Sequence, residues 1–268
     1  MPATASARIR IGVGGWNYEP WRGAFYPRGL PHSRELEHAS RKLTSIEIDS
    51  TYYGSKTPET FARWRDETPD DFVFAVKGPR FATNRRVLGE AGASVERFFK
   101  TGVMELKGKL GPVNWQFATT KRFDPDDFGA FLNLLPSSVD GLAIRHAVEV
   151  RNESFRTAEF VDLARAHEVA VVVAGDSAFP LIADLTAPFV YVRVMGTTET
   201  EKLGYSDEAL DVWAKRARAW AQGGAPPDLA AVGAPVANVA GRDVFLYVIS
   251  GFKALNPAAA MGLIERLR

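Results

Sequence analysis

The stretch 46–53 combines the periodicity of a β-strand with two carboxylates. Ile46 and Ile48 alternate with Glu47 and Asp49, which is the period-two pattern of a strand. Similar short apolar strands recur along the chain, and helical segments separate most of them, which predicts a parallel sheet covered on both faces. The two carboxylates therefore point into a protected interior, where a charge is costly unless it is paired or used. They belong either to a structural ion-pair network or to a site.

Other predicted strands repeat this feature near their carboxyl ends, where the active sites of parallel barrels lie. Because alternate strand positions face the barrel interior, the inward carboxylates are predicted to be Glu47, Asp49, Glu149 and Asp176. These are the candidate catalytic acids and bases. The inward ligand-binding candidates are Lys77, Arg151, Arg193 and Gln116. These charges have two interpretations. Either they neutralise one another in ion pairs that stabilise the barrel, or they bind a small anionic ligand, since arginine binds carboxylate or phosphate with two parallel hydrogen bonds.

The loops that follow these strands carry further candidates. Trp16 and Tyr52 are expected above the ring of charges, where aromatic rings can stack on sugars or bases. The alternative is that they close the barrel mouth as a hydrophobic cluster. Arg80 begins a basic loop with Arg85 and Arg86, which is either a phosphate or nucleic-acid patch or an ordinary solvated loop.

Metal and nucleophile chemistry find little support in the residue types. The chain has no cysteine and four histidines, and none of the histidines has the spacing of a metal motif. A magnesium or manganese site built from the four inward carboxylates alone stays open, although the interleaved cations would compete for the same oxygens. We therefore expect no metal site and no cofactor.

Length and composition fit one barrel domain. The chain has 268 residues, of which 46% are hydrophobic, and ~250 residues are typical of an eight-stranded α/β barrel. A formal net charge of +1 does not mark the whole chain as a binder of nucleic acid or membranes. No apolar run reaches the ~18 residues of a membrane span, and no signal peptide is evident, so we expect a cytoplasmic protein.

The elements that position the ring are eight expected strands separated mostly by helices. The strands are predicted over 8–13, 43–49, 72–77, 113–117, 146–151, 169–174, 189–195 and 244–249. This order predicts a TIM-like (β/α)8 barrel as a single domain over 1–268; an open doubly wound sheet lacks its Gly-rich phosphate turn here. Residues 1–7 are expected to be a loose tail, and the Gly-, Ala- and Pro-rich stretch 222–242 a flexible surface insertion.

Several ordered motifs resemble those of the YecE-like family, also called domain of unknown function 72. The motifs that carry the resemblance are Gly12-Val13-Gly14-Gly15-Trp16, Phe25-Tyr26-Pro27, Glu47-Ile48-Asp49-Ser50-Thr51-Tyr52-Tyr53, Leu110-Gly111-Pro112, Glu149-x-Arg151 and Tyr191-Val192-Arg193-x-x-Gly196. The resemblance extends over nearly the whole chain and implies a barrel fold. It implies no activity.

The chain departs from the family pattern in three places. Asn152 stands where the family tends to have a histidine, and Phe117-Ala118-Thr119 replaces a Leu-Pro-Pro. Ile249-Ser250 stands where paired asparagines close the last strand. These changes favour an altered substrate or a loss of catalysis.

Three functional hypotheses follow. The first is a protein that binds a small anionic ligand, such as a phosphorylated sugar or nucleotide, and acts on it as a hydrolase or lyase by metal-independent acid–base chemistry. The second, which rests on fold analogy, is a metal-assisted phosphodiester hydrolase or nucleic-acid binder of the endonuclease IV type. The third is a ligand-binding or interaction protein without catalysis.

Overall fold

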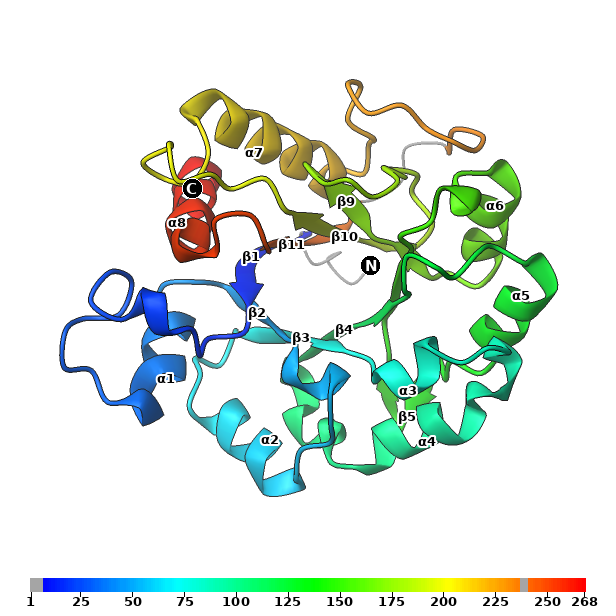
Figure 1. Ribbon diagram of the computed structural model, residues 1–268, viewed down its shortest axis with the longest axis horizontal. Coiled ribbons are helices and arrows are strands. Elements are labelled where there is room, and N and C mark those ends of the chain that lie inside the picture. The colour runs from blue at the N-terminus through cyan, green and yellow to red at the C-terminus, as the bar shows by residue number, and fades with distance from the viewer. Residues whose placement is uncertain (1–6, 237–240) are drawn as a thin grey trace, which may run out of the picture.

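Parallel strands surrounded by helices form the architecture of the computed structural model, which describes residues 7–236 and 241–268 (Figure 1). Nine strands make one sheet in the order β8-β7-β4-β3-β2-β1-β11-β10-β9. Their bounds are β1 Ile9–Gly14, β2 Ser45–Ile48, β3 Val73–Lys77, β4 Leu110–Gln116, β7 His146–Glu149, β8 Ala170–Val171, β9 Val173–Gly175, β10 Phe189–Val194 and β11 Asp243–Val248. All neighbouring pairs in this sheet are parallel.

The two ends of this sheet are consecutive pieces of one predicted strand. Only Val172 separates β8, which pairs with β7, from β9, which pairs with β10. The segment 170–175 therefore closes the sheet into a barrel by pairing with one neighbour through its first half and with the other through its second half. The predicted (β/α)8 barrel is confirmed, and the open doubly wound alternative is wrong.

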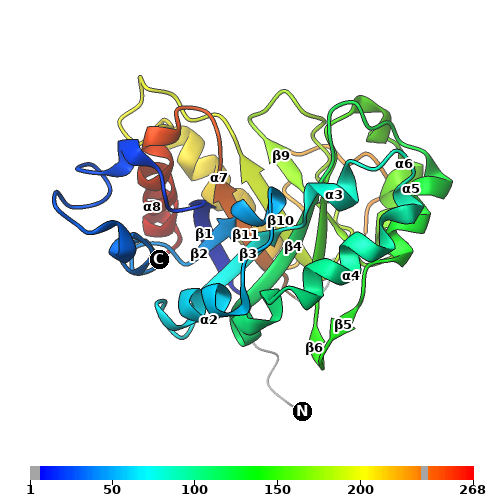
Figure 2. The ribbon, with the colours of Figure 1, turned by 60° about the horizontal axis from the view of Figure 1, so that its bottom comes forward.

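Helices lie around the outside of the sheet (Figures 1 and 2). They are α1 Glu35–Ser40, α2 Pro58–Asp66, α3 Arg80–Thr83, α4 Gly92–Lys100, α5 Pro125–Asn133, α6 Ala158–Ala166, α7 Asp207–Ala221 and α8 Asn256–Leu267. Side-chain oxygens of Thr57, Asp124, Thr157 and Ser206 accept backbone N–H groups at the starts of α2, α5, α6 and α7. Such caps satisfy donors that a helix end would leave unpaired. None of the helices in the described ranges is both long enough and apolar enough to cross a lipid bilayer.

Two connections differ from the usual helical crossover. Between β9 and β10, the segment 177–188 contains no helix. Between α5 and β7, the strands β5 Ser138–Val139 and β6 Leu142–Ala143 form an antiparallel hairpin that the sequence did not indicate. The central residues of its turn, Asp140 and Gly141, both have positive φ angles, as a tight hairpin turn requires. The hairpin precedes β7 and so lies at the amino end of the barrel strands, away from the site, at the bottom of Figure 2.

Alternation along the strands divides the core into two layers. Ile11 and Val13 of β1 belong to the large layer between sheet and helices. The barrel interior holds a smaller apolar cluster, which includes Ala75, Ala147 and Tyr191. Small residues on the inner face leave room inside the barrel for long polar side chains.

The insertion predicted over 222–242 is described as far as residue 236, whereas residues 237–240 and most of the predicted tail, 1–6, lie outside the described residues. The described part contains no helix or strand. It is nevertheless held to the barrel, because the Asp184 carboxylate, whose side chain is fully buried, accepts the backbone N–H groups of Val232 and Gly233 at 2.8 and 2.9 Å. Arg165 donates to the Ala234 carbonyl at 2.8 Å.

Replacing Asp184 with Ala is expected to lower the free energy of unfolding by ~1–3 kcal/mol, because two backbone donors lose their acceptor. Limited proteolysis of the folded variant should then cut within 224–236 faster than in the wild type. Asp70→Ala is the control for a general effect of aspartate removal, because Asp70 is exposed and its side chain forms no hydrogen bond or ion pair within the described residues. Equal cleavage rates in wild type and Asp184→Ala would show that this carboxylate does not hold the segment.

Candidate functional site

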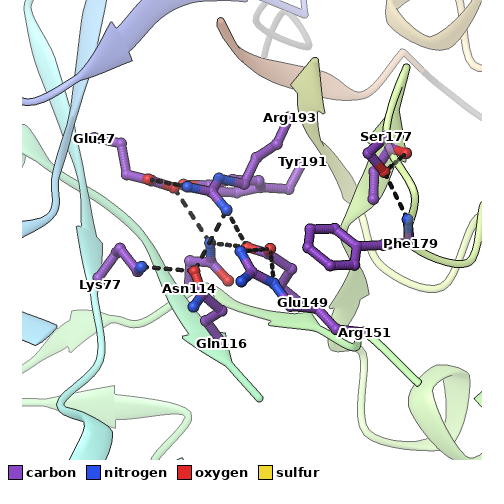
Figure 3. A network of polar contacts seen from close by, with 11 residues as sticks. Glu47, Lys77, Asn114, Gln116, Glu149, Arg151, Ser177, Phe179, Tyr191 and Arg193 are labelled. Carbon is purple, nitrogen blue, oxygen red and sulfur yellow. Dashed lines mark hydrogen bonds and ion pairs between the residues drawn. The ribbon is translucent and has the colours of Figure 1, made fainter. Parts of the chain in front are cut away.

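Arg193 is the centre of a polar network inside the barrel (Figure 3). It projects from β10 and forms ion pairs with Glu47 of β2, through Nη2 and Oε1 at 3.1 Å, and with Glu149 of β7. The two carboxylates have no solvent exposure, and the arginine side chain is 5% exposed. One guanidinium therefore joins strands on three sides of the barrel. This arrangement is the structural ion-pair network, one of the two alternatives that the sequence left open.

Neutral side chains complete the hydrogen bonding of both carboxylates. Asn114 Nδ2 donates to Glu47 Oε2 at 3.2 Å and to Glu149 Oε2 at 3.3 Å, and the Tyr191 hydroxyl also donates to Glu47. Burial alone would raise the pKa of Glu149, but Arg193, Arg151 and Lys77 outweigh it and hold that pKa below its ordinary value. Burial and the neighbouring Glu47 raise the pKa of the Tyr191 hydroxyl, which keeps it a donor. Glu149 is thus held as an anion paired with Arg193 and Arg151.

Lys77, the last residue of β3, differs from the other cations of the site. Its Nζ donates to the neutral Gln116 Oε1 at 2.6 Å and lies 4.3 Å from the centre of the Tyr52 ring. Within 7–236 and 241–268, no carboxylate comes within 4.0 Å of this ammonium group. Burial and the nearby Arg193 lower the pKa of Lys77 to about 8. Lys77 is therefore a buried cation held by an amide and an aromatic face.

Arg151 lies at the solvent side of the network. Its Nε and Nη2 donate to Glu149 Oε1 at 2.8 and 2.6 Å, and its guanidinium carbon lies 4.3 Å from the centre of the Phe179 ring. The side chain is 21% exposed. Arg151 can therefore meet a ligand from solvent without leaving Glu149.

The other two predicted carboxylates lie apart from this network. Burial and Glu47 raise the pKa of Asp49, and Lys253 and Lys77 lower it less. Asp49 is half-buried at the end of β2, so it is a carboxylate that can hold a proton near the barrel mouth.

Asp176 lies outside the barrel interior network. It follows the end of β9 with a φ of 52°, and its Oδ2 accepts from Trp213 Nε1 of α7 at 2.8 Å. The expectation that Asp176 belongs to the inward ring is therefore wrong.

The predicted aromatic and basic loop residues are also divided. Tyr52 lies beside Lys77, as expected for a residue at the ring. The Trp16 ring instead packs edge-on against Trp64 of α2 at 5.0 Å, in the layer between sheet and helices. Arg80 is exposed beside the rings of Tyr53 and Phe81 and is not part of the ring of charges. Of these three predicted contacts, only Tyr52 lies next to the inward cations.

Three polar residues of the barrel interior were missed as site residues: Asn114, Tyr191 and Tyr247. Asn114 and Tyr191 have the same inward parity as Gln116 and Arg193, two positions later on the same strands. The Tyr247 hydroxyl lies 2.7 Å from Ser45 Oγ, one layer below the charges. Applying the parity rule to uncharged polar residues would have identified all three.

Asn152, which replaces the histidine of the family pattern, joins two loops. Its Nδ2 donates to the Thr119 carbonyl at 2.7 Å, and its Oδ1 accepts from the Ser154 amide at 3.1 Å. Both polar atoms of the amide form hydrogen bonds to the backbone, so the Asn152 side chain stabilises the conformation of these loops. No cluster of three or more His, Cys, Asp or Glu side chains suited to a metal ion occurs in the parts of the chain that the structure describes.

Comparisons with known proteins agree on one family. The profile described as "Protein of unknown function DUF72" matches residues 10–268. The UPF0759 protein YecE of Escherichia coli K12 is 26% identical over 251 residues, which cover 83% of this chain and 88% of YecE. A DUF72 family protein of Thermotoga maritima has a TM-score of 0.73 at 20% identity, covering 97% of this chain and 99% of that one. One of Enterococcus faecalis has a TM-score of 0.70 at 17% identity, covering 97% and 95%.

Proposed function

The chain belongs to the DUF72 family, and from this premise we propose that it binds a small anionic ligand, such as a phosphorylated sugar or nucleotide, at the mouth of its barrel. The family description states no activity, so the proposal rests on the site. In this proposal Lys77 and Arg151 hold the anion, and Asp49 transfers a proton. No metal ion is required for this chemistry.

The observation that carries the proposal is the charge of the buried cluster. Glu47 and Glu149 face Arg193, Arg151 and Lys77, so two carboxylates against three cations leave one positive charge. Lys77 is the cation of this cluster that has no carboxylate within 4.0 Å in the described residues, although Glu47 and Glu149 act on it from farther away. Burying such a charge is costly, and an anionic ligand would offset that cost while the ammonium group donates to it.

The proton-transfer role rests on Asp49. Its raised pKa favours the protonated form more than in an ordinary aspartate, which is the direction that a general acid requires. Glu47 and Glu149 act in this proposal as positioning residues, because their oxygens are occupied by Arg193, Asn114 and Tyr191. This revises the catalytic role that the sequence suggested for both glutamates.

Replacing Lys77 with Met is expected to abolish the stabilisation of the protein by its anionic ligand. The measurement is a thermal-shift screen of the wild type against inorganic phosphate, sugar phosphates and nucleotides, repeated with the variant. Since the pKa of Lys77 is about 8, the lysine carries its charge below that pH. Ligand affinity should therefore fall as the pH rises through about 8.

Lys215→Met, which removes an exposed lysine of α7, is the matched control and should respond like the wild type. If no phosphorylated compound stabilises the wild type, the proposed ligand class is wrong. If Lys77→Met responds as strongly as the wild type, the ligand binds elsewhere.

A binding protein without catalysis is the second candidate, and Asn152 favours it. Both polar ends of this side chain bridge loops, and an amide does not titrate, so the position offers no acid or base. Under this reading Asp49→Asn leaves ligand affinity unchanged, and the wild type releases the bound compound chemically intact, as mass spectrometry would show.

A further inference from the structure

A cavity lies beside the barrel mouth, among the turn 50–56, α2, α3 and α4. It encloses about 270 Å³, close to the ~300 Å³ at which small-molecule sites begin. Its apolar lining comes from Phe61 and Phe98, which are buried, and from Pro79 and Phe81. Phe81 is 60% exposed, although large aromatic side chains are usually covered. The cavity therefore offers aromatic surface to a ligand from solvent.

The polar lining of this cavity is basic. Lys56, Arg85 and Arg97 line it, together with the hydroxyl groups of Ser55, Ser94 and Thr101, and no lining residue is acidic. Across the described ranges 7–236 and 241–268, none of the three cations forms an ion pair. Arg85 Nη2 donates to Ser94 Oγ at 3.4 Å, while its Nε is buried without a hydrogen-bond partner in the same ranges. An anion would satisfy that donor.

From this combination we infer that the cavity binds a nucleotide. A phosphate monoester carries a charge of about −1.5 to −2 at pH 7 and three acceptor oxygens, which suits several cations better than a single carboxylate does. The phosphate lies among Lys56, Arg85 and Arg97. The base lies against the phenylalanine rings, since every base has a π-face that stacks on aromatic side chains. The hydroxyl groups of Ser55, Ser94 and Thr101 form hydrogen bonds with the ribose.

The nucleotide can be free or one unit of a single-stranded nucleic acid. The residues around Arg85 could accommodate the second case. Arg85 also lines a neighbouring hollow with Arg86, Lys121 and Arg122. Of the acidic residues there, Asp124 caps α5, and Asp127 accepts the amides of Leu88 and Gly89 and pairs with Lys121 at 3.8 Å, which leaves Arg86 and Arg122 without an ion pair in the described residues. Flanking phosphates of a strand would find cations in this hollow.

This cavity is distinct from the barrel-mouth site, although the two are neighbours. Thr51 lines the cavity, and its Oγ1 donates to the Lys77 carbonyl at 2.7 Å. The Lys77 ammonium group, by contrast, points to Gln116 inside the barrel. A variant at Lys77 therefore separates the two proposals experimentally.

Isothermal titration calorimetry of the full chain tests the inference with adenosine 5′-monophosphate, adenosine, phenyl phosphate and inorganic phosphate. The double variant Arg85→Gln, Arg97→Gln should weaken binding of the monophosphate by about ten-fold or more, because charged hydrogen bonds are lost. Arg86→Gln is the matched control from the same loop and does not line the cavity. Circular dichroism verifies that each variant is folded, and Phe81→Ala replaces the double variant if that protein does not fold.

The expected result is a monophosphate-binding event that survives Lys77→Met and Arg86→Gln and is lost in the double variant; a second event that only Lys77→Met removes would belong to the barrel mouth. No binding at millimolar concentration overturns the inference, and so does binding that Lys77→Met abolishes while the double variant keeps it. Phenyl phosphate binding as tightly as the nucleotide overturns the nucleotide assignment. A single-stranded pentanucleotide that binds more tightly than the monophosphate, and loses this advantage in Arg86→Gln, identifies the strand as the source.

Discussion

Replacing Arg193 with Met is expected to lower the free energy of unfolding by ~3–5 kcal/mol at pH 7, because it leaves buried carboxylates without their cation. Glu47 and Glu149 are both fully buried and both paired to this guanidinium. Asn114 and Tyr191 donate hydrogen bonds to these carboxylates but supply no charge. Urea-induced unfolding of wild type and variant measures the difference.

The loss should depend on pH in a defined direction. The pKa of Glu149 is lowered in the folded protein: burial acts against this, and Arg193 is the strongest of the cations that cause it. Its stabilising contribution is therefore complete above the unfolded-state pKa of ~4.3 and is lost as the pH falls through the folded-state value. In the variant this glutamate takes up a proton more readily, so the difference in stability should shrink as the pH falls, and wild type and variant should converge only below the lowered folded-state pKa of Glu149 in the wild type.

Arg156→Met supplies the matched control, because Arg156 is 53% exposed and, among the residues that the structure describes, pairs only with the exposed Glu153 at 3.6 Å. Such a surface pair contributes ~0–1 kcal/mol. A loss below about 1 kcal/mol in Arg193→Met at pH 7 would mean that Arg193 does not hold the network together.

Gly12→Ala is expected to destabilise the barrel by ~3 kcal/mol or more, or to prevent folding. Gly12 on β1 lies in register between Tyr247 of β11 and Ser45 of β2. The hydroxyls of these two residues lie 2.7 Å apart, so their hydrogen bond crosses the position of Gly12. A Cβ atom there would lie 1.9 Å from the Ser45 carbonyl oxygen, which is backbone and cannot rotate away.

Gly108→Ala controls for the general effect of removing a glycine, because no atom lies within 4 Å of a Cβ at that position. Thermal unfolding followed by circular dichroism compares the two variants. An unfolding midpoint for Gly12→Ala within a few degrees of the wild type would show that β1 and β2 can separate at little cost. The close approach of these strands would then not be needed for the network above it.

The amino-acid sequence by itself determined the strands, their parity and the end of the barrel that carries the polar residues. Alternation in stretches such as Ile46 to Asp49 is a local property, because successive side chains of a strand point to opposite faces. Glu47, Lys77, Gln116, Glu149 and Arg193 could therefore be assigned to one interior. The family motifs led to the same fold.

Only the tertiary structure decided which of these residues meet. Parity gives the face of a strand but not the height of a residue in the barrel, which depends on the register between neighbouring strands and on how the sheet closes. Arg193 therefore reaches Glu47 and Glu149 across the barrel, whereas Asp176, just past the end of its strand, turns to Trp213. The cavity of Arg85 and Arg97 was equally hidden, because α4 and the loop before it bring these residues together in space. The sequence thus determined the set of candidate residues, and the packing of strands and helices divided them into a neutralised network, a single unbalanced lysine and a separate basic cavity.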